Sequence, residues 1–226
     1  MISSTQKIIE QYERRKYDKR IKSHSDNFYF NHFVQAEREL IYTEIFKKRF
    51  SSLDSIRLLE IGAGTGVNLL FFKRLGLKWE NLYGNELLPD RFEIIRSTFP
   101  MIKTFKGDAC DIEINKNEEF DIVFQSTVFT SILDIDFKIK LADKMWSLLK
   151  TTGIILWYDF TFDNPNNKDV KGIKKKEIRN LFHESGKIIF HRATLAPPIG
   201  RRIKKFYPFV NILPLLRTHI IAEIEK

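Results

Sequence analysis

Three glycines at alternate positions, Gly62, Gly64 and Gly66, follow a short apolar run that includes an acidic residue, Glu60. Glycines leave the main chain open to a ligand because no side chain stands in the way. A dinucleotide-binding turn would have its third glycine at the position of Val67, and a phosphate-binding P-loop would have a lysine directly after the turn. The acid favours a ligand that carries positive charge. The alternative is a glycine-rich turn that binds nothing.

Four further polar residues, Glu86, Asp108, Gln125 and Asp159, stand at or just beyond the ends of predicted strands. In an open parallel sheet, ligands bind where the carboxyl ends of the strands meet, so we expect these side chains and Glu60 to face one crevice. Glu86 comes twenty residues after the last glycine of the turn. A carboxylate in that place can accept hydrogen bonds from both hydroxyls of a ribose.

Asp108 comes directly before a small residue, Ala109. An acid in this place can accept a hydrogen bond from the exocyclic amine of adenine, while backbone N–H groups donate hydrogen bonds to the ring nitrogens. Each acid by itself could instead cap the N-terminus of a helix. The prediction of a nucleoside-type ligand therefore depends on their joint placement.

Alternating strands and helices are predicted to bring these strand ends to one edge. Apolar runs predict strands over 57–61, 82–86, 101–106, 120–125 and 153–159. Apolar residues at helical spacing predict helices over 33–50, 69–75, 89–99 and 137–150. Such alternation indicates right-handed crossovers and a doubly wound, mostly parallel α/β sheet.

The two ends of the chain add to this α/β unit. Residues 1–50 are predicted to form an N-terminal helical cap, with a helix and then an extended stretch over 1–30. The rest, 51–226, is predicted to be the ligand-binding domain. Its stretch 196–216 holds four prolines and is too long for a hairpin turn, so we expect an insertion over the active face, before the last of seven strands. The last elements predicted are a helix over 174–184 and strands over 188–195 and 218–223.

Length and composition favour one domain in a reducing compartment. A chain of 226 residues can bury a sizeable core without dividing in two. Neither a membrane-spanning stretch nor a signal peptide is recognisable, which predicts a cytoplasmic protein. The single cysteine, Cys110, can form no internal disulfide, and His24, His183 and His191 show no metal-ligand spacing, so no metal site is expected.

The formal net charge of +9 could indicate an anionic partner such as nucleic acid, acidic lipid or a phosphate-bearing substrate. Lysine is also the usual residue of solvated surfaces, which is the expectation for Lys171 and for 174–176. No nucleic-acid-binding motif is recognisable. We therefore expect no nucleic-acid partner.

A basic stretch, 201–205, is followed by an aromatic and apolar one that ends at Leu213. Basic groups beside apolar ones suit an interfacial helix on an anionic membrane, which predicts peripheral membrane contact through 199–216. The alternative is a flap that packs on its own domain or on a second copy. Prolines argue against one continuous helix. The sequence leaves the oligomeric state open.

The ordered motifs over about 57–160 resemble those of the class I, Rossmann-like S-adenosylmethionine-dependent methyltransferases. They include Leu-Leu-Lys-Thr-Thr-Gly at 148–153, where Thr152 replaces a frequent glycine or proline. The resemblance implies S-adenosylmethionine as cofactor, S-adenosylhomocysteine as product and no metal. The implied cofactor residues are Glu60 and Gly62 for the methionine end, Gly64 and Gly66 in the same turn, Glu86 with Leu87 for the ribose, Asp108 with Ala109 for the adenine, and Gln125 for the methionine channel.

Five further segments resemble bacterial methyltransferases that are often encoded in surface-polysaccharide loci. This narrower resemblance implies that the acceptor is a hydroxyl of a sugar or glycan, free, nucleotide-linked or lipid-linked, and so in some forms phosphate-bearing. The segments are 129–134, 157–160, 164–166, 195–198 and 216–219.

Two other functions stay open at this point. One is methyl transfer to a small metabolite or a carboxylate, in a pocket formed by Phe129, Trp157 and Tyr158. The other is an RNA-binding methyltransferase, or a binding module without catalysis, that uses the basic surface. The Asn-Pro-Pro-Tyr signature of amide methylation is absent, because Gln-Ser-Thr-Val stands at 125–128. Methylation of adenine or amide nitrogen is therefore disfavoured.

Transfer to a hydroxyl needs a base within hydrogen-bond reach to remove the proton. Asp159 is the first candidate, because it ends the fifth predicted strand beside the cofactor site; its alternative role is a cap or a partner of an arginine. His32 is the second, because the N-terminal segment of such enzymes commonly covers the cofactor and would bring Tyr29 and His32 over the mouth. His219, at the start of the last strand, is the third. A surface position for His32 and a structural hydrogen bond for His219 are the alternatives.

Overall fold

The computed structural model describes residues 3–16, 27–115, 118–165 and 167–226. Most of the predicted extended stretch near the N-terminus lies outside these residues, as do His24 and Asn166. Among the described helices, none combines the length and the apolar composition that are needed to cross a membrane.

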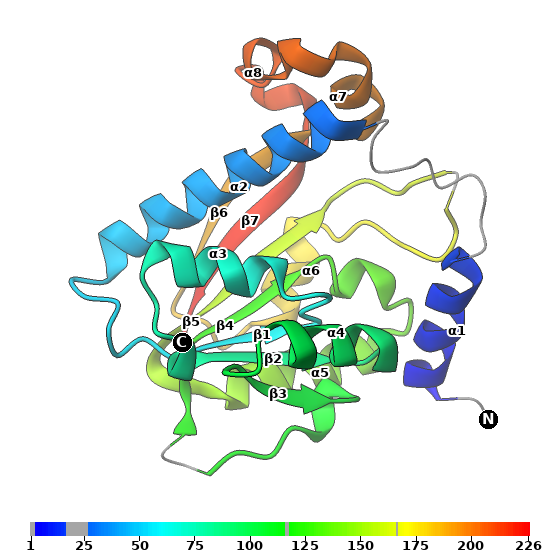
Figure 1. The fold of residues 1–226 in the computed structure, drawn as a ribbon. Helices are drawn as coiled ribbons and strands as arrows, with labels where there is room; N and C mark the ends of the chain where they lie inside the picture. Colours follow the sequence, from blue (N-terminus) through cyan, green and yellow to red (C-terminus); the bar gives the residue numbers. More distant parts are fainter. Residues whose placement is uncertain (1–2, 17–26, 116–117, 166) are drawn as a thin grey trace.

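Seven strands form one sheet in the order β3-β2-β1-β4-β5-β7-β6 (Figure 1). The strands are β1 (Leu58–Ile61), β2 (Leu82–Glu86), β3 (Lys103–Lys106), β4 (Phe120–Ser126), β5 (Leu149–Phe160), β6 (Lys187–Leu195) and β7 (Arg217–Glu225). Neighbours from β3 to β5 pair in parallel, whereas β7 is antiparallel to both β5 and β6. The predicted doubly wound, seven-stranded, mostly parallel sheet is confirmed.

Helices cover both faces of this sheet (Figure 1). The α-helices are α1 (Ser4–Lys16), α2 (Phe28–Arg49), α3 (Val67–Leu75), α4 (Pro89–Thr98), α5 (Ile135–Ser147), α6 (Lys175–Leu181), α7 (Pro197–Ile203) and α8 (Tyr207–Val210). The 3-10 turns are η2 (Trp79–Asn81), η3 (Ala109–Asp111), η5 (Phe129–Ser131), η6 (Lys204–Phe206) and η7 (Pro214–Leu216). One apolar core lies between the sheet and α2, α3 and α4, and another lies between the sheet and α5 and α6.

Alternation along β4 explains how one strand serves both cores. Ile122 and Phe124 belong to the core under α2 and α3, and Val123 belongs to the core under α5. A parallel strand that is covered by helices on both faces is apolar at every position, which is why the run is continuous. The same alternation decides which face each polar residue at the strand ends joins.

Several predicted boundaries are wrong; β5, for example, begins at Leu149 rather than at residue 153. Phe28 begins α2, whereas the sequence predicts an extended stretch up to residue 30. The helix predicted over 137–150 ends at Ser147, because Leu149 already pairs with Phe120 of β4. Pairing across the sheet therefore overrides the helical spacing of apolar residues at this end.

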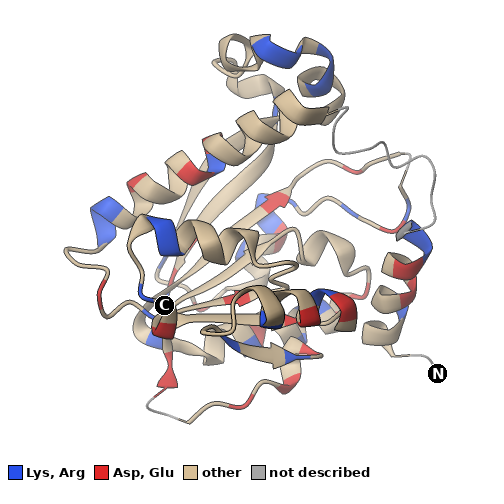
Figure 2. Ribbon diagram, viewed as in Figure 1, with Lys and Arg blue, Asp and Glu red and all other residues tan. Residues whose placement is uncertain are grey.

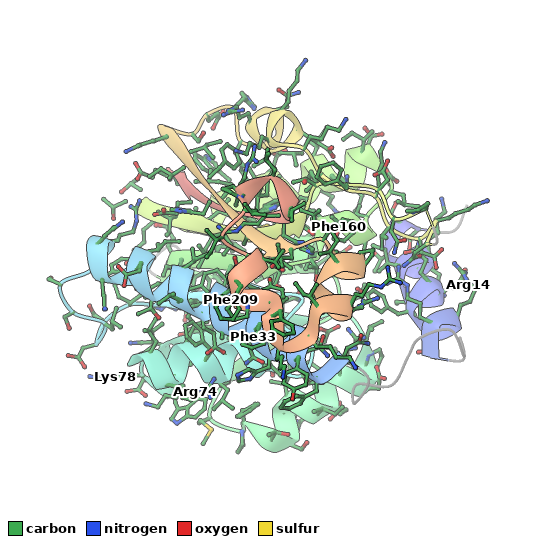
Figure 3. The ribbon with its side chains drawn as sticks, turned by 90° about the horizontal axis from the view of Figure 1, so that it is seen from above. Arg14, Phe33, Arg74, Lys78, Phe160 and Phe209 are labelled. Atoms are coloured by element: carbon green, nitrogen blue, oxygen red, sulfur yellow. The ribbon has the colours of Figure 1, made fainter. Side chains whose placement is uncertain are left out.

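The insertion before β7 lies across the N-terminal part of α2. The ring of Tyr207, which is buried, stacks on Phe33 of α2 with 5.6 Å between centroids. Gly200 lies so close to α2 that a Cβ would approach the ring of Phe30 to 2.5 Å. Figure 3 looks down on this end of the molecule, with Phe33 labelled on α2 and Phe209 on α8. The insertion is broken into short helices and turns and is anchored on α2.

Candidate active site

The glycine turn joins β1 to α3 with positive φ angles of +66° at Gly62, +61° at Gly64 and +84° at Gly66. A Cβ at Gly62 would lie 2.6 Å from Cγ2 of Val128, so the turn packs closely on the loop after β4. A Cβ at Gly64 would meet nothing within 4 Å. The bare main chain at Gly64 therefore borders open space in which a ligand can lie.

Glu86 ends β2 and holds the glycine turn through its carboxylate. The backbone N–H of Gly64 donates to Oε2 at 2.7 Å, and the backbone N–H of Leu88 donates to Oε1 at 2.8 Å. Burial raises the pKa of Glu86, while these N–H donors act in the opposite direction. Each carboxylate oxygen keeps a further lone pair, which is what binding to a ribose diol would use.

Asp108 follows β3 and caps the turn η3. Its Oδ1 accepts from the backbone N–H of Cys110 at 2.9 Å, and its Oδ2 accepts from Thr5 Oγ1 of α1 at 2.8 Å. The capping role that the sequence offers as an alternative is therefore real. With this role Asp108 still lies beside the pocket, and through Thr5 it also connects α1 to the edge of the sheet.

An open pocket of about 610 Å³ lies between this edge of the sheet and α1. Thr5, Ile8 and Tyr12 form the wall that α1 contributes. The sequence instead assigns the cover to Tyr29 and His32. The spacing of Thr5, Ile8 and Tyr12 places them on one face of a helix, but it does not show what that face covers. Predicted cofactor residues that line the pocket are Gly62, Glu86, Leu87, Asp108 and Ala109.

Glu60 is fully buried at the start of the glycine turn. Its Oε1 accepts from Asn68 Nδ2 at 2.6 Å, whereas its Oε2 has no hydrogen-bond partner among the described residues. Burial raises the pKa of this carboxyl to about 8, and the bond from Asn68 opposes that shift. A buried oxygen without a donor is costly, so the site is suited to a ligand that brings an ammonium or another donor.

Asp159 and Gln125 lie on the other face of the sheet from Glu60. They alternate along their strands with Tyr158 and Phe124, which belong to the core under α2 and α3. Oδ1 of Asp159 accepts from Thr130 Oγ1 at 2.6 Å, and Oδ2 accepts from Gln125 Nε2 at 3.2 Å. Burial raises the pKa of Asp159 to about 7, against the effect of both bonds. The carboxyl is thus balanced between its two protonation states near neutral pH.

Arg38 of α2 is a residue of this site that sequence reasoning missed. Its Nη2 donates to Asn68 Oδ1 at 3.0 Å and to Ser126 Oγ at 3.3 Å, and its guanidinium carbon lies 4.2 Å from the centroid of the Tyr158 ring. Its charge also lowers the pKa of the nearby Glu60, against the larger effect of burial. No sequence motif marks Arg38, since only the packing of α2 on the sheet brings it to the glycine turn.

The two histidine candidates lie elsewhere. His219 is buried on β7, where its ring stacks on Tyr158 at 5.3 Å and its Nδ1 lies 3.1 Å from Thr218 Oγ1. Burial lowers the pKa of His219 to about 4, so its ring is neutral at neutral pH. His32 is exposed on α2 and stacks on Phe28 at 6.1 Å. Neither histidine lines the pocket under α1.

The aromatic residues considered as an acceptor pocket are packed in the core. Phe129 and Trp157 are both fully buried, and their ring centroids are 4.3 Å apart. They therefore pack within the core of the domain and do not form the wall of an open pocket. As for metals, the described residues include no group of three or more His, Cys, Asp or Glu side chains that could hold an ion.

The sheet order, the glycine turn and the pocket at the carboxyl ends of β1 to β3 define an α/β domain that binds a nucleoside-type ligand. Residues 59–157 match a family that is described as a methyltransferase domain. This match shows a methyltransferase domain in the chain, and the prediction that the protein is a methyltransferase is confirmed.

Solved structures share the fold at low identity. An S-adenosylmethionine-dependent methyltransferase from Archaeoglobus fulgidus is 14% identical, with a TM-score of 0.56 and coverage of 88% of this chain and 100% of that chain. One from Mesorhizobium loti is 11% identical, with a TM-score of 0.56 and coverage of 81% and 96%. A TehB-like one from Corynebacterium glutamicum is 12% identical, with a TM-score of 0.54 and coverage of 87% and 97%. No sequence among the curated proteins matches the chain.

The residues present fit S-adenosylmethionine. Two buried atoms have no hydrogen-bond partner among the described residues: Oε2 of Glu60 suits the ammonium of this ligand, and Nε of Arg38 suits its carboxylate. The main chain at Gly64 borders open space, and Glu86 and Asp108 both line the pocket, which agrees with the prediction that they bind the ribose and the adenine. The ammonium and the carboxylate of the ligand would thus each lie beside a side chain of opposite charge.

Proposed function

We propose that this protein is an O-methyltransferase that transfers the methyl group of S-adenosylmethionine to a hydroxyl of a bacterial surface-glycan sugar. The observation that supports hydroxyl chemistry is the buried carboxyl of Asp159, whose pKa of about 7 is near the value a general base needs at neutral pH. The glycan part of the proposal is supported by the resemblance of the segments that surround this carboxyl, 129–134 and 157–160.

When bound, S-adenosylmethionine supplies an electrophilic methyl group on a sulfonium sulfur. The chain then has to hold the acceptor oxygen in line with the methyl–sulfur bond and exclude water, and positioning of this kind can supply roughly 7–11 kcal/mol. Gln125 holds Asp159 and also accepts from the backbone N–H of Val128 at 3.0 Å, so it fixes the loop after β4 at the side of the glycine turn. This loop therefore sets the distance between cofactor and acceptor.

Asp159 takes the proton of the acceptor hydroxyl in this proposal. Its Oδ1 is occupied by Thr130 Oγ1, so the acceptor hydroxyl replaces that bond when it binds. The proton moves to the carboxylate as the new methyl–oxygen bond forms. A base of this kind contributes roughly 10²–10⁴-fold to the rate. His32 and His219 stay the second and third candidates for this base; like Asp159, neither lines the pocket that α1 covers.

One observation favours a second candidate, methyl transfer to a carboxylate or another anionic small molecule. Arg38 presents a partly buried cation at the end of β4, next to Ser126, and its Nε has no hydrogen-bond partner among the described residues. In the glycan proposal this cation binds the cofactor. In the alternative it binds the acceptor, so an Arg38→Gln variant would keep cofactor affinity and lose the acceptor.

The test is methyl transfer from labelled S-adenosylmethionine to a panel of nucleotide sugars, surface-glycan oligosaccharides and small carboxylic acids. Calorimetry with S-adenosylhomocysteine first establishes that the preparation binds the cofactor. Label in an alkali-stable sugar ether supports the proposal. Label in an alkali-labile ester assigns a carboxylate acceptor instead, and cofactor binding without label on any sugar contradicts the glycan assignment.

A further inference from the structure

The insertion, residues 197–216, has a basic stretch at 201–205 that is followed by an apolar and aromatic one. It holds four cationic residues and no acidic residue. All four are exposed, and Figure 2 shows them as blue segments at one tip of the molecule. The four residues are Arg201, Arg202, Lys204 and Lys205.

Apolar side chains of the same segment divide into an inner and an outer set. The inner set packs on α2 and β6, with Tyr207 as its most buried member. The outer set is exposed, from 55% at Leu213 to 88% at Leu215. Because the inner set already anchors the segment, the outer set is not needed for packing on its own domain. Its members are Phe206, Phe209, Ile212, Leu213 and Leu215.

We propose that this outer face docks on the surface of an anionic phospholipid bilayer. Lysine and arginine heads bind lipid phosphates while aromatic and aliphatic side chains enter the boundary between headgroups and acyl chains. The arrangement at the tip has both parts in one short segment: Lys205 lies over the ring of Phe206 at 5.6 Å, next to the exposed Phe209. Scattered apolar residues on a monomer surface do not show such a joint pattern.

Charge decides between a bilayer and a second copy of this chain. In a two-fold dimer through this face the same patch meets itself, so four cations of one copy would face four of the other. The net charge of +9 adds to that repulsion. An anionic lipid surface instead pairs each cation with a phosphate.

Docking through this face would also orient the methyltransferase site. The insertion leaves β6 after Leu195 and enters the antiparallel β7 at Arg217, so it lies at the same edge of the sheet as the end of β5 and Asp159. A bound bilayer would therefore lie near the acceptor edge, which suits a lipid-linked acceptor. The docking proposal itself holds for any acceptor, because it depends only on residues 197–216.

The experiment is sedimentation of the full chain with vesicles of phosphatidylcholine, with and without phosphatidylglycerol, at low and high salt. We expect binding only to the vesicles that contain phosphatidylglycerol, and weaker binding at high salt. Arg201→Gln/Arg202→Gln should weaken binding roughly 25-fold, about fivefold for each charge. Phe209→Ser/Ile212→Ser should weaken it roughly tenfold or more, because apolar burial is lost.

Matched controls carry the same changes on other surfaces. Lys174→Gln/Lys176→Gln removes two exposed charges near α6, and Ile94→Ser removes an exposed apolar side chain from α4. Both should bind vesicles as the parent chain does, and circular dichroism checks that every variant is folded.

No binding to anionic vesicles, or equal loss in the controls, overturns the proposal. A dimer that forms without lipid and is abolished by Phe209→Ser/Ile212→Ser assigns the face to a second copy and also overturns it. Cofactor binding is measured separately, so a failure of docking is distinct from a failure of the methyltransferase proposal.

Discussion

The cofactor edge and the acceptor edge of this sheet are built in different ways. At the cofactor edge, the turn after β1 is held by the acid that ends β2, and both belong to one short β-α-β stretch. At the acceptor edge, Asp159, Gln125 and Thr130 come from three separate elements, β5, β4 and η5. A site made by local turns can be recognised from spacing, whereas a site assembled from distant elements depends on how they pack.

The two edges also differ in which face of the sheet they use. Glu60, Ser126 and Tyr158 alternate onto the face of α2, where Arg38 lies. Gln125 and Asp159 alternate onto the face of α5. The loop after β4 connects them, because the backbone N–H of Val128 donates to Gln125. The comparison predicts that variants on one side change cofactor affinity and variants on the other change the rate.

The largest effect is expected for Asp159→Asn. If Asp159 is the base, the rate of methyl transfer to the best acceptor should fall roughly 10²–10⁴-fold, while the affinity for S-adenosylhomocysteine stays within a factor of a few. In the parent chain the rate should rise with pH through about 7, as Asp159 loses its proton, and this step should vanish in the variant. An unchanged rate and pH profile would move the base elsewhere.

Glu86→Ala should have the next largest effect, on the cofactor side only. The variant loses a ribose ligand and leaves the N–H groups of Gly64 and Leu88 without an acceptor, so cofactor affinity should fall by about 1–3 kcal/mol, which is roughly 5- to 150-fold. Glu80→Ala, an exposed acid just before the other end of β2, is the control in the same calorimetric titration. Full affinity in Glu86→Ala would remove the ribose assignment.

A smaller effect is expected on stability, through Glu60. The pKa of its carboxyl is about 8 in the folded chain and near the ordinary value of 4.5 in the unfolded chain, so between these pH values the folded state binds one more proton than the unfolded state. Stability contributed by this group is therefore present at low pH and lost as pH rises from about 5 to 8. In the cofactor-free protein, Tm should fall between pH 5 and pH 8, and in Glu60→Gln this fall should be smaller by a few °C, as thermal unfolding at each pH would show. A decline of the same slope in the variant would assign it to other groups, Asp159 among them.

The smallest effect tests the cover of the cofactor edge. Thr5→Val removes the bond to Asp108 while it keeps the shape of the side chain, so amide exchange in α1 should speed up roughly two- to tenfold. Thr43→Val is the matched control, because Thr43 Oγ1 bonds only within α2, to the carbonyl oxygen of Glu39. Equal exchange of α1 in Thr5→Val and the parent chain would show that the Asp108 bond does not hold α1 in place.

Much of the cofactor edge follows from the sequence. The alternation of apolar strands with helices predicts the sheet, and the distance from the glycine turn to Glu86 predicts that an acid ends the next strand at the same edge. These inferences succeed because the chain between them forms one short unit with few possible conformations. The capping role of Asp108 and its place beside the pocket are likewise visible in the residues around it.

Only the tertiary structure decides what covers the pocket and what faces Glu60. Thr5, Ile8 and Tyr12 come from a helix joined to the domain through residues that carry no motif, and Arg38 becomes part of the site through the packing of Tyr42 and Phe46 on the sheet. The depth at which Asp159 is buried, and with it a pKa of about 7, is set by β4, β5 and η5 together. The sequence by itself determined which residues stand at the strand ends, because spacing is local. Which of them are buried, hydrogen-bonded or left without a hydrogen-bond partner depends on contacts between distant segments. Burial and hydrogen bonding in turn decide their pKa values and so their chemistry.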